Sequence, residues 1–137
     1  MSAEENKEHS FTGIHILGEM YGIEPSLLDN IDYLGKALCE GIEASGASLC
    51  DMQSKQFEPQ GVTMLALLSE SHASIHTYPD EGALFFDAFT CGRTCQPTRI
   101  ADALAKALKP SHKVMKEIER GKPVSSETST EAPGKNS

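Results

Sequence analysis

Three strand-like segments follow one another between residues 62 and 91, and this run constrains the fold more than any other feature. The segments are residues 62–68, 71–78 and 83–91, and they carry many β-branched and aromatic side chains. Few residues separate them, and Pro79-Asp80-Glu81-Gly82 supplies a turn between the last two. Connections this short join antiparallel strands, because a parallel crossover needs about a dozen residues or more. The run therefore predicts an antiparallel sheet.

Two amphipathic helices are predicted on either side of this run. Pro25-Ser26 opens the first helix, which we expect to end at Gly46. Its apolar residues recur at steps of three or four and are Leu27, Ile31, Leu34, Leu38 and Ile42. The second helix begins at Pro97 and stops at Pro110. It places Ile100, Leu104 and Leu108 inward and Lys106 outward.

Three more strands complete the predicted fold. Residues 12–21 form the first, with Ile14, Ile16 and Met20 on one face, and residues 47–57 form a less regular one. Residues 112–120 carry charged side chains between apolar ones, which suits an edge strand. The order β-α-β-β-β-β-α-β predicts an α+β two-layer sandwich, an antiparallel sheet with two helices on one face.

Length and charge bound the classes of protein to consider. The chain has 137 residues, enough for one domain, and we expect residues 1–10 to be flexible, 11–120 folded and 121–137 a disordered tail. A net charge of −8 lacks the basic footprint of a nucleic-acid or membrane-surface binder. Nothing resembles a signal peptide or a membrane span, so we expect a cytoplasmic protein.

Chemically active side chains gather in and after the second of the three central strands. His72 and His76 share one face of that strand with Ser74 between them, and Cys91 closes the next strand. A zinc site would need Cys91 or an acid as third ligand, and His-x-x-x-His alone is weak evidence, so we expect no metal. Taken singly, the histidines suit hydrogen-bonded structural roles, Cys91 a core cysteine or a tuned thiol, and Ser71 a loop position.

The combination of these residues resembles the short prokaryotic S-adenosylmethionine decarboxylases, which are pyruvoyl-dependent enzymes made as proenzymes. The resemblance spans residues 13–121. Its motifs are Gly13-Ile14-His15, Gly61-Val62-Thr63, Ser69-Glu70-Ser71-His72, Ile75-His76-Thr77-Tyr78-Pro79, Phe89-Thr90-Cys91-Gly92 and Glu119-Arg120-Gly121.

This resemblance implies that the domain formed by residues 11–120 cleaves itself between Glu70 and Ser71. Ser71 becomes a covalent pyruvoyl group, the only cofactor expected, and residues 1–70 and 71–137 stay together as partners in one sheet. The family's roles make His76 the acceptor of the Ser71 α-proton during processing and Thr63 a hydroxyl residue that assists it. Cys91 takes the place of the proton donor in the catalytic cycle.

The resemblance also implies a substrate and a partner. S-adenosylmethionine would form a Schiff base with the pyruvoyl group and release CO₂, which gives the aminopropyl donor for spermidine synthesis. Phe57, Tyr78 and Asp80 occupy substrate-binding positions, with Asp80 where the family usually has Glu. Family members form homodimers with sites near the subunit interface. Two alternatives stay open: a pyruvoyl enzyme for ornithine or arginine, and a non-processing regulatory relative.

Overall fold

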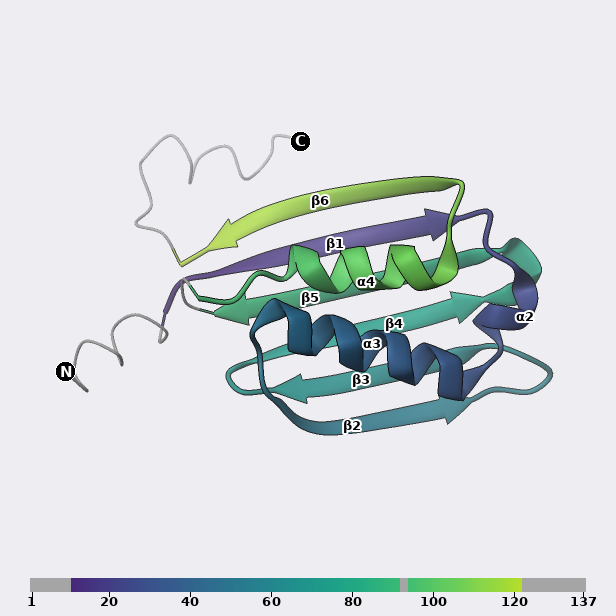
Figure 1. The fold of residues 1–137 in the computed structure, drawn as a ribbon, viewed down its shortest axis with the longest axis horizontal. Coiled ribbons are helices and arrows are strands. Elements are labelled where there is room, and N and C mark those ends of the chain that lie inside the picture. The colour runs from purple at the N-terminus through teal and green to yellow at the C-terminus, as the bar shows by residue number, and fades with distance from the viewer. Residues whose placement is uncertain (1–10, 92–93, 122–137) are drawn as a thin grey trace, which may run out of the picture.

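A six-stranded antiparallel sheet forms the framework of the molecule (Figure 1). The computed structural model describes residues 11–91 and 94–121. Its strands lie in the order β2-β3-β4-β5-β1-β6. The elements are β1 (Gly13–Tyr21), α2 (Pro25–Leu28), α3 (Ile31–Ser45), β2 (Leu49–Gln56), β3 (Val62–Leu68), β4 (Ser71–Tyr78), the 3₁₀ turn η1 (Pro79–Glu81), β5 (Ala83–Cys91), α4 (Thr98–Leu108) and β6 (His112–Arg120).

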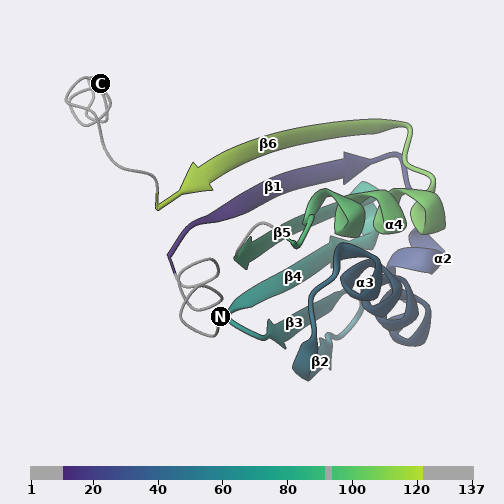
Figure 2. The ribbon, with the colours of Figure 1, turned by 60° about the vertical axis from the view of Figure 1, so that its left-hand side comes forward.

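The predicted α+β two-layer sandwich is confirmed. Helices α3 and α4 lie side by side across one face of the sheet, and no helix of residues 11–91 and 94–121 lies on the other face (Figures 1 and 2). Strands β2 and β6 are the two outer strands, as expected for residues 112–120. No helix in the described part of the chain is long and apolar enough to cross a membrane.

Alternation along the strands gives the sheet two chemically different faces. Successive side chains point to opposite sides, so one set lies under the helices and the other lies on what we call the open face. The covered side is a continuous apolar core. Its largest fully buried side chains include Met20, Leu34, Leu38, Ile42, Leu68, Ile75, Leu84, Ile100, Leu104 and Leu108. Burying such side chains stabilises the fold by about 1.5–3 kcal/mol each.

The predicted first helix is wrong in one respect, because it is two helices rather than one. Helix α2 ends at Leu28, and α3 begins at Ile31 with Asn30 as its N-cap, whose side chain accepts from the Tyr33 amide. Thr77 Oγ1 donates to the Leu28 carbonyl at 2.7 Å. A helix continuing through this point would need that carbonyl for its own hydrogen bonds, so the tertiary contact favours the break.

Two sequence predictions lie outside the described residues. These are the flexible segment 1–10 and the disordered tail, of which only Gly121 is described. The two ends of the described chain lie together in the β1–β6 pair, where Gly13 lies opposite Arg120. That end of the sheet also holds the turn between β3 and β4 (Figure 1).

Candidate active site

The Glu70–Ser71 bond lies at the tightest turn of the sheet. Strand β3 ends at Leu68 and β4 begins at Ser71, so only Ser69 and Glu70 connect them. Glu70 has φ = 66°, in the left-handed region that residues with a side chain rarely adopt. A backbone held there costs about 1–3 kcal/mol. The bond predicted to be cut therefore follows a strained residue.

Cys91 reaches this bond from the end of β5. Its Sγ donates to the Glu70 carbonyl oxygen at 3.0 Å, and Ser71 Oγ donates to the Ser69 carbonyl at 3.4 Å. Partial burial, the nearby Glu70 charge and Cys95 raise the pKa of the Cys91 thiol. The thiol therefore keeps its proton at neutral pH, as a proton donor must.

His76 and Thr63 form a separate pair on the open face. They stand opposite one another on β4 and β3, and Thr63 Oγ1 lies 3.1 Å from His76 Nδ1. Five residues of extended strand separate His76 from Ser71, which is about 16 Å along β4. The structure thus joins Thr63 to His76 and keeps both away from the Ser71 of the same chain.

The predicted substrate-binding residues lie at the far end of the sheet from Ser71. Tyr78 ends β4, Phe57 follows β2, and Asp80 lies in η1. All three are exposed, and the Tyr78 ring packs 5.0 Å from that of Phe85. Seven residues of β4 separate Tyr78 from Ser71, about 23 Å. This distance along β4 is too long for one substrate molecule to contact both Ser71 and these side chains of the same chain.

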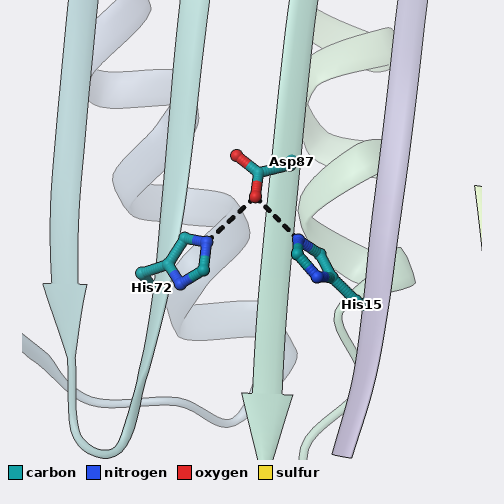
Figure 3. Close-up of side chains that lie close together, drawn as sticks. All are labelled: His15, His72 and Asp87. Atoms are coloured by element: carbon teal, nitrogen blue, oxygen red, sulfur yellow. Dashed lines mark hydrogen bonds and ion pairs between the residues drawn. The ribbon is translucent and has the colours of Figure 1, made fainter. Parts of the chain in front are cut away.

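A cluster that the sequence did not predict lies between these two groups. His15 Nε2 and His72 Nε2 both point at Asp87 Oδ2, at 2.7 and 2.9 Å, and Ser74 Oγ donates to Asp87 Oδ1 (Figure 3). Partial burial raises the pKa of Asp87, but the hydrogen bonds from Ser74, His15 and His72 outweigh it and bring the pKa below its ordinary value. Asp87 is therefore ionised at neutral pH.

Asp87 escaped prediction because it is a single charge in an otherwise apolar strand. The sequence predicts only a strand over residues 83–91 and assigns no role to Asp87. The available signal was its place: alternation puts Asp87 on the same face as Cys91, and the strand register puts it opposite Ser74. A partly buried charged side chain needs hydrogen-bond partners, and His15 and His72 provide them.

The geometry of this cluster favours hydrogen bonding over metal binding. His72 and His76 lie four residues apart on an extended strand, about 13 Å, so the His-x-x-x-His pair cannot share an ion. His15, His72 and Asp87 have ligand atoms within 4.8 Å of one another. However, Arg120 Nη1 lies 3.0 Å from His15 Nδ1. Arg is a donor only, so His15 Nδ1 must accept, and its proton is on Nε2, the atom that a metal would need.

Comparison with known proteins decides what kind of protein carries this arrangement. The family model described as S-adenosylmethionine decarboxylase matches residues 14–121. The chain belongs to this family. A proenzyme of that name from Brevibacillus brevis is 44% identical over 114 residues, covering 83% of this chain and 86% of the relative. One from Methanococcus maripaludis is 41% identical over 109 residues, covering 80% and 89%.

The same family accounts for the fold. The crystal structure of the adenosylmethionine decarboxylase from Aquifex aeolicus superposes with a TM-score of 0.77 and 29% identity, covering 83% of this chain and 94% of that one. The match of the S-adenosylmethionine decarboxylase family model includes His15 and Arg120 as well as the turn, so the cluster lies inside the shared domain.

Proposed function

We propose that this protein is a proenzyme that cuts its own chain between Glu70 and Ser71 and then decarboxylates S-adenosylmethionine. The observation that carries the proposal is the thiol of Cys91, which donates to the Glu70 carbonyl at the strained turn. It places a protonated acid on the carbonyl that Ser71 attacks during processing. Membership of the family and the printed names of the relatives support the same activity.

The cutting reaction uses only side chains of the protein and water. Ser71 Oγ attacks the Glu70 carbonyl carbon, the amide C–N bond breaks, and an ester forms. The Cys91 hydrogen bond stabilises the negative charge that develops on that carbonyl oxygen. His76 removes the Ser71 α-proton, the ester C–O bond breaks, and Glu70 leaves as a free carboxylate. Water then replaces the nitrogen of residue 71 and releases ammonia.

The resulting pyruvoyl group on residue 71 supplies a ketone that condenses with an amine and accepts electrons as the carboxylate leaves. Cys91 delivers a proton to the substrate carbon that has lost CO₂. Its raised pKa suits this role, because a thiolate could not donate. Delivery to the right carbon also protects the enzyme, since misplaced protonation would consume the ketone.

A second copy of the chain completes the site in this proposal. Ser71 lies about 16 Å from His76 and about 23 Å from Tyr78 along β4, whereas all three belong to one reaction. The open face on which His76 stands is rich in exposed apolar side chains, which a solvated sheet face normally lacks. These are Leu17, Leu65, Leu67, Tyr78, Phe85, Val114 and Ile118. A two-fold partner stacked face to face brings its His76 and Thr63 toward Ser71.

Substrate recognition then uses Phe57, Tyr78 and Asp80 from the far end of the partner's sheet. Aromatic faces suit an adenine ring and a sulfonium cation, and an acid suits ribose hydroxyls. Decarboxylation makes the aminopropyl donor for spermidine synthesis. All four cysteines are unpaired in this structure, which is consistent with the cytoplasm as the compartment that we propose.

The test measures CO₂ release from carboxyl-labelled substrates by the purified protein. We expect release from S-adenosylmethionine and none above background from ornithine or arginine, with Ser71→Ala as the blank. Release from ornithine or arginine alone would keep the chemistry and replace the substrate. No release by a chain that stays uncut would indicate the non-processing regulatory relative.

A further inference from the structure

His15 and His72, the two histidines that contact Asp87, differ in whether their second ring nitrogen has a partner among the described residues. Asp87 holds the Nε2 sides of both rings, and Figure 3 shows the opposite edge of each ring turned away from the carboxylate. Arg120 takes the Nδ1 of His15. His72 Nδ1 makes no hydrogen bond within residues 11–91 and 94–121. It is a free acceptor on the residue that directly follows Ser71.

A chain of hydrogen bonds fixes which nitrogen of His72 is free. Arg120, stacked 4.8 Å over the Phe89 ring, donates to His15, and His15 must then donate from Nε2 to Asp87. Asp87 is ionised and only accepts, so His72 also donates from Nε2. Its Nδ1 therefore carries the lone pair. This is the arrangement in which a carboxylate orients an imidazole as a base and stabilises the cation it becomes.

His72 is also accessible to a reactant. It lines an open hollow of about 330 Å³ together with Asp51, Gln53, Leu65, Leu67 and Ser74. The ionisable groups near it are Asp51 from β2, His15 from β1, and Asp87 and Cys91 from β5. The helices lie on the other face of the sheet (Figure 2). Residue 71 begins β4 at the end of the sheet where Cys91 closes β5, so a small molecule bound to it that extends over the open face would lie beside His72 and Cys91.

The proposed reaction needs a base at this place. An α-amino group is an ammonium ion at neutral pH, and it must lose a proton before it can attack a ketone. We infer that His72 is a further catalytic residue: its Nδ1 takes a proton from the substrate's ammonium group and returns it to the oxygen that leaves as water. Asp87, His15 and Arg120 are positioning residues for it. Protons balance, because the departing water carries two: the one that His72 took and returned, and a second that the substrate nitrogen gives up as the C=N bond forms.

The inference rests on the proposed function, since it requires residue 71 to carry the ketone. Its test therefore measures capture of amines rather than CO₂ release. Cleaved protein is mixed at pH 7 with the decarboxylated product amine, which is an ammonium ion, or with methoxyamine, which is neutral. Borohydride fixes the adducts, and intact mass follows their formation with time. The variants are His72→Gln and Asp87→Asn, with His112→Gln on the outer strand β6 as the matched control.

We expect His72→Gln to slow capture of the product amine about 100-fold, which is the lower end of the range for general acid–base catalysis. The same variant should slow capture of methoxyamine less than about twofold. Asp87→Asn keeps a hydrogen-bond acceptor but removes the charge, so we expect it to slow capture of the product amine about tenfold and to leave capture of methoxyamine unchanged. The product-amine rate of His72→Gln should also rise steeply with pH up to about pH 9, because only free amine then reacts. His112→Gln should leave both rates unchanged.

Equal slowing with both amines would overturn the inference, because it would show a structural role. Unchanged capture in both variants would overturn it as well. If His72→Gln blocks self-cleavage, Asp87→Asn decides by the same two rates. A wild-type chain that stays uncut and does not react with methoxyamine refutes the proposed function instead, so the two failures are distinguishable.

Discussion

The two faces of the sheet divide the work of this protein. The covered face is made of apolar side chains that helices α3 and α4 bury, and no residue assigned to chemistry points into it apart from Ser71, which lies at its very end. The open face carries Cys91, His76, Thr63 and the Asp87 cluster. Both faces belong to the same strands and differ only by alternation. One face thus sets the fold, and the other carries most of the side chains to which we assign the proposed chemistry.

Mixing two inactive variants gives the largest expected effect. Neither His76→Ala nor Ser71→Ala should cut its own chain when expressed alone. In mixed dimers the Ser71→Ala chain can offer its His76 to the Ser71 of the other chain. We expect the His76→Ala chain to be cut when the two are co-expressed, as seen by gel or mass. Absence of cutting in purified mixed dimers would show that His76 acts within its own chain.

Removing the thiol on the open face comes next in size. Cys91→Ala should lower turnover of S-adenosylmethionine by about 10²–10⁴-fold, because a positioned acid is lost. The free energy of unfolding should change little, because Cys91 is only partly buried. The control is Cys39→Ala, an exposed free cysteine on α3. A Cys91→Ala enzyme with full turnover would contradict its role as proton donor.

A matched leucine pair compares the two faces in stability. Leu104 is fully buried under the sheet, whereas Leu65 is 52% exposed on the open face. Leu104→Ala should lower the free energy of unfolding by about 2–5 kcal/mol, and Leu65→Ala should cost clearly less. Denaturant unfolding in a Ser71→Ala background, at one protein concentration, measures both on an uncut chain. Equal losses would mean that the open face is as much a core as the covered one.

The smallest expected effect is the loss of the stabilising contribution of Asp87 at low pH. The folded pKa of Asp87 lies below its ordinary value of 3.8, so its stabilising contribution is complete above that pH and disappears as pH falls through the folded value. The difference in unfolding free energy between wild type and Asp87→Asn should therefore shrink as the pH drops below about 4. A difference that stays constant from pH 7 to pH 2.5 would show that the carboxylate charge adds nothing.

The covered face could be predicted from the sequence, and the open face only in part. Helical spacing at Leu34, Leu38 and Ile42 and the apolar central strands specify the core without knowledge of register. The break before Ile31 depends on Thr77, a contact between distant parts of the chain. Asp87 was missed because its partners lie on β1 and β4, and only strand register brings them together.

Nearness in sequence does not mean nearness in space within this motif. Ser71 and His76 lie five residues apart in one signature, which suggests a single cluster, but an extended strand places them about 16 Å apart. Cys91, twenty residues beyond Ser71, contacts the turn directly. Under the proposed function, motif spacing identifies which residues take part, and strand geometry is the reason for proposing that two chains supply them.

The most direct test of the account is the intact mass of the purified protein under denaturing conditions. The proposed self-cleavage should give two fragments, residues 1–70 and 71–137, the second without a free amine at its start and labelled by a carbonyl reagent. Ser71→Ala should give one uncut chain that the reagent does not label. One uncut, unreactive wild-type chain, or a cut at any other bond, would contradict the account.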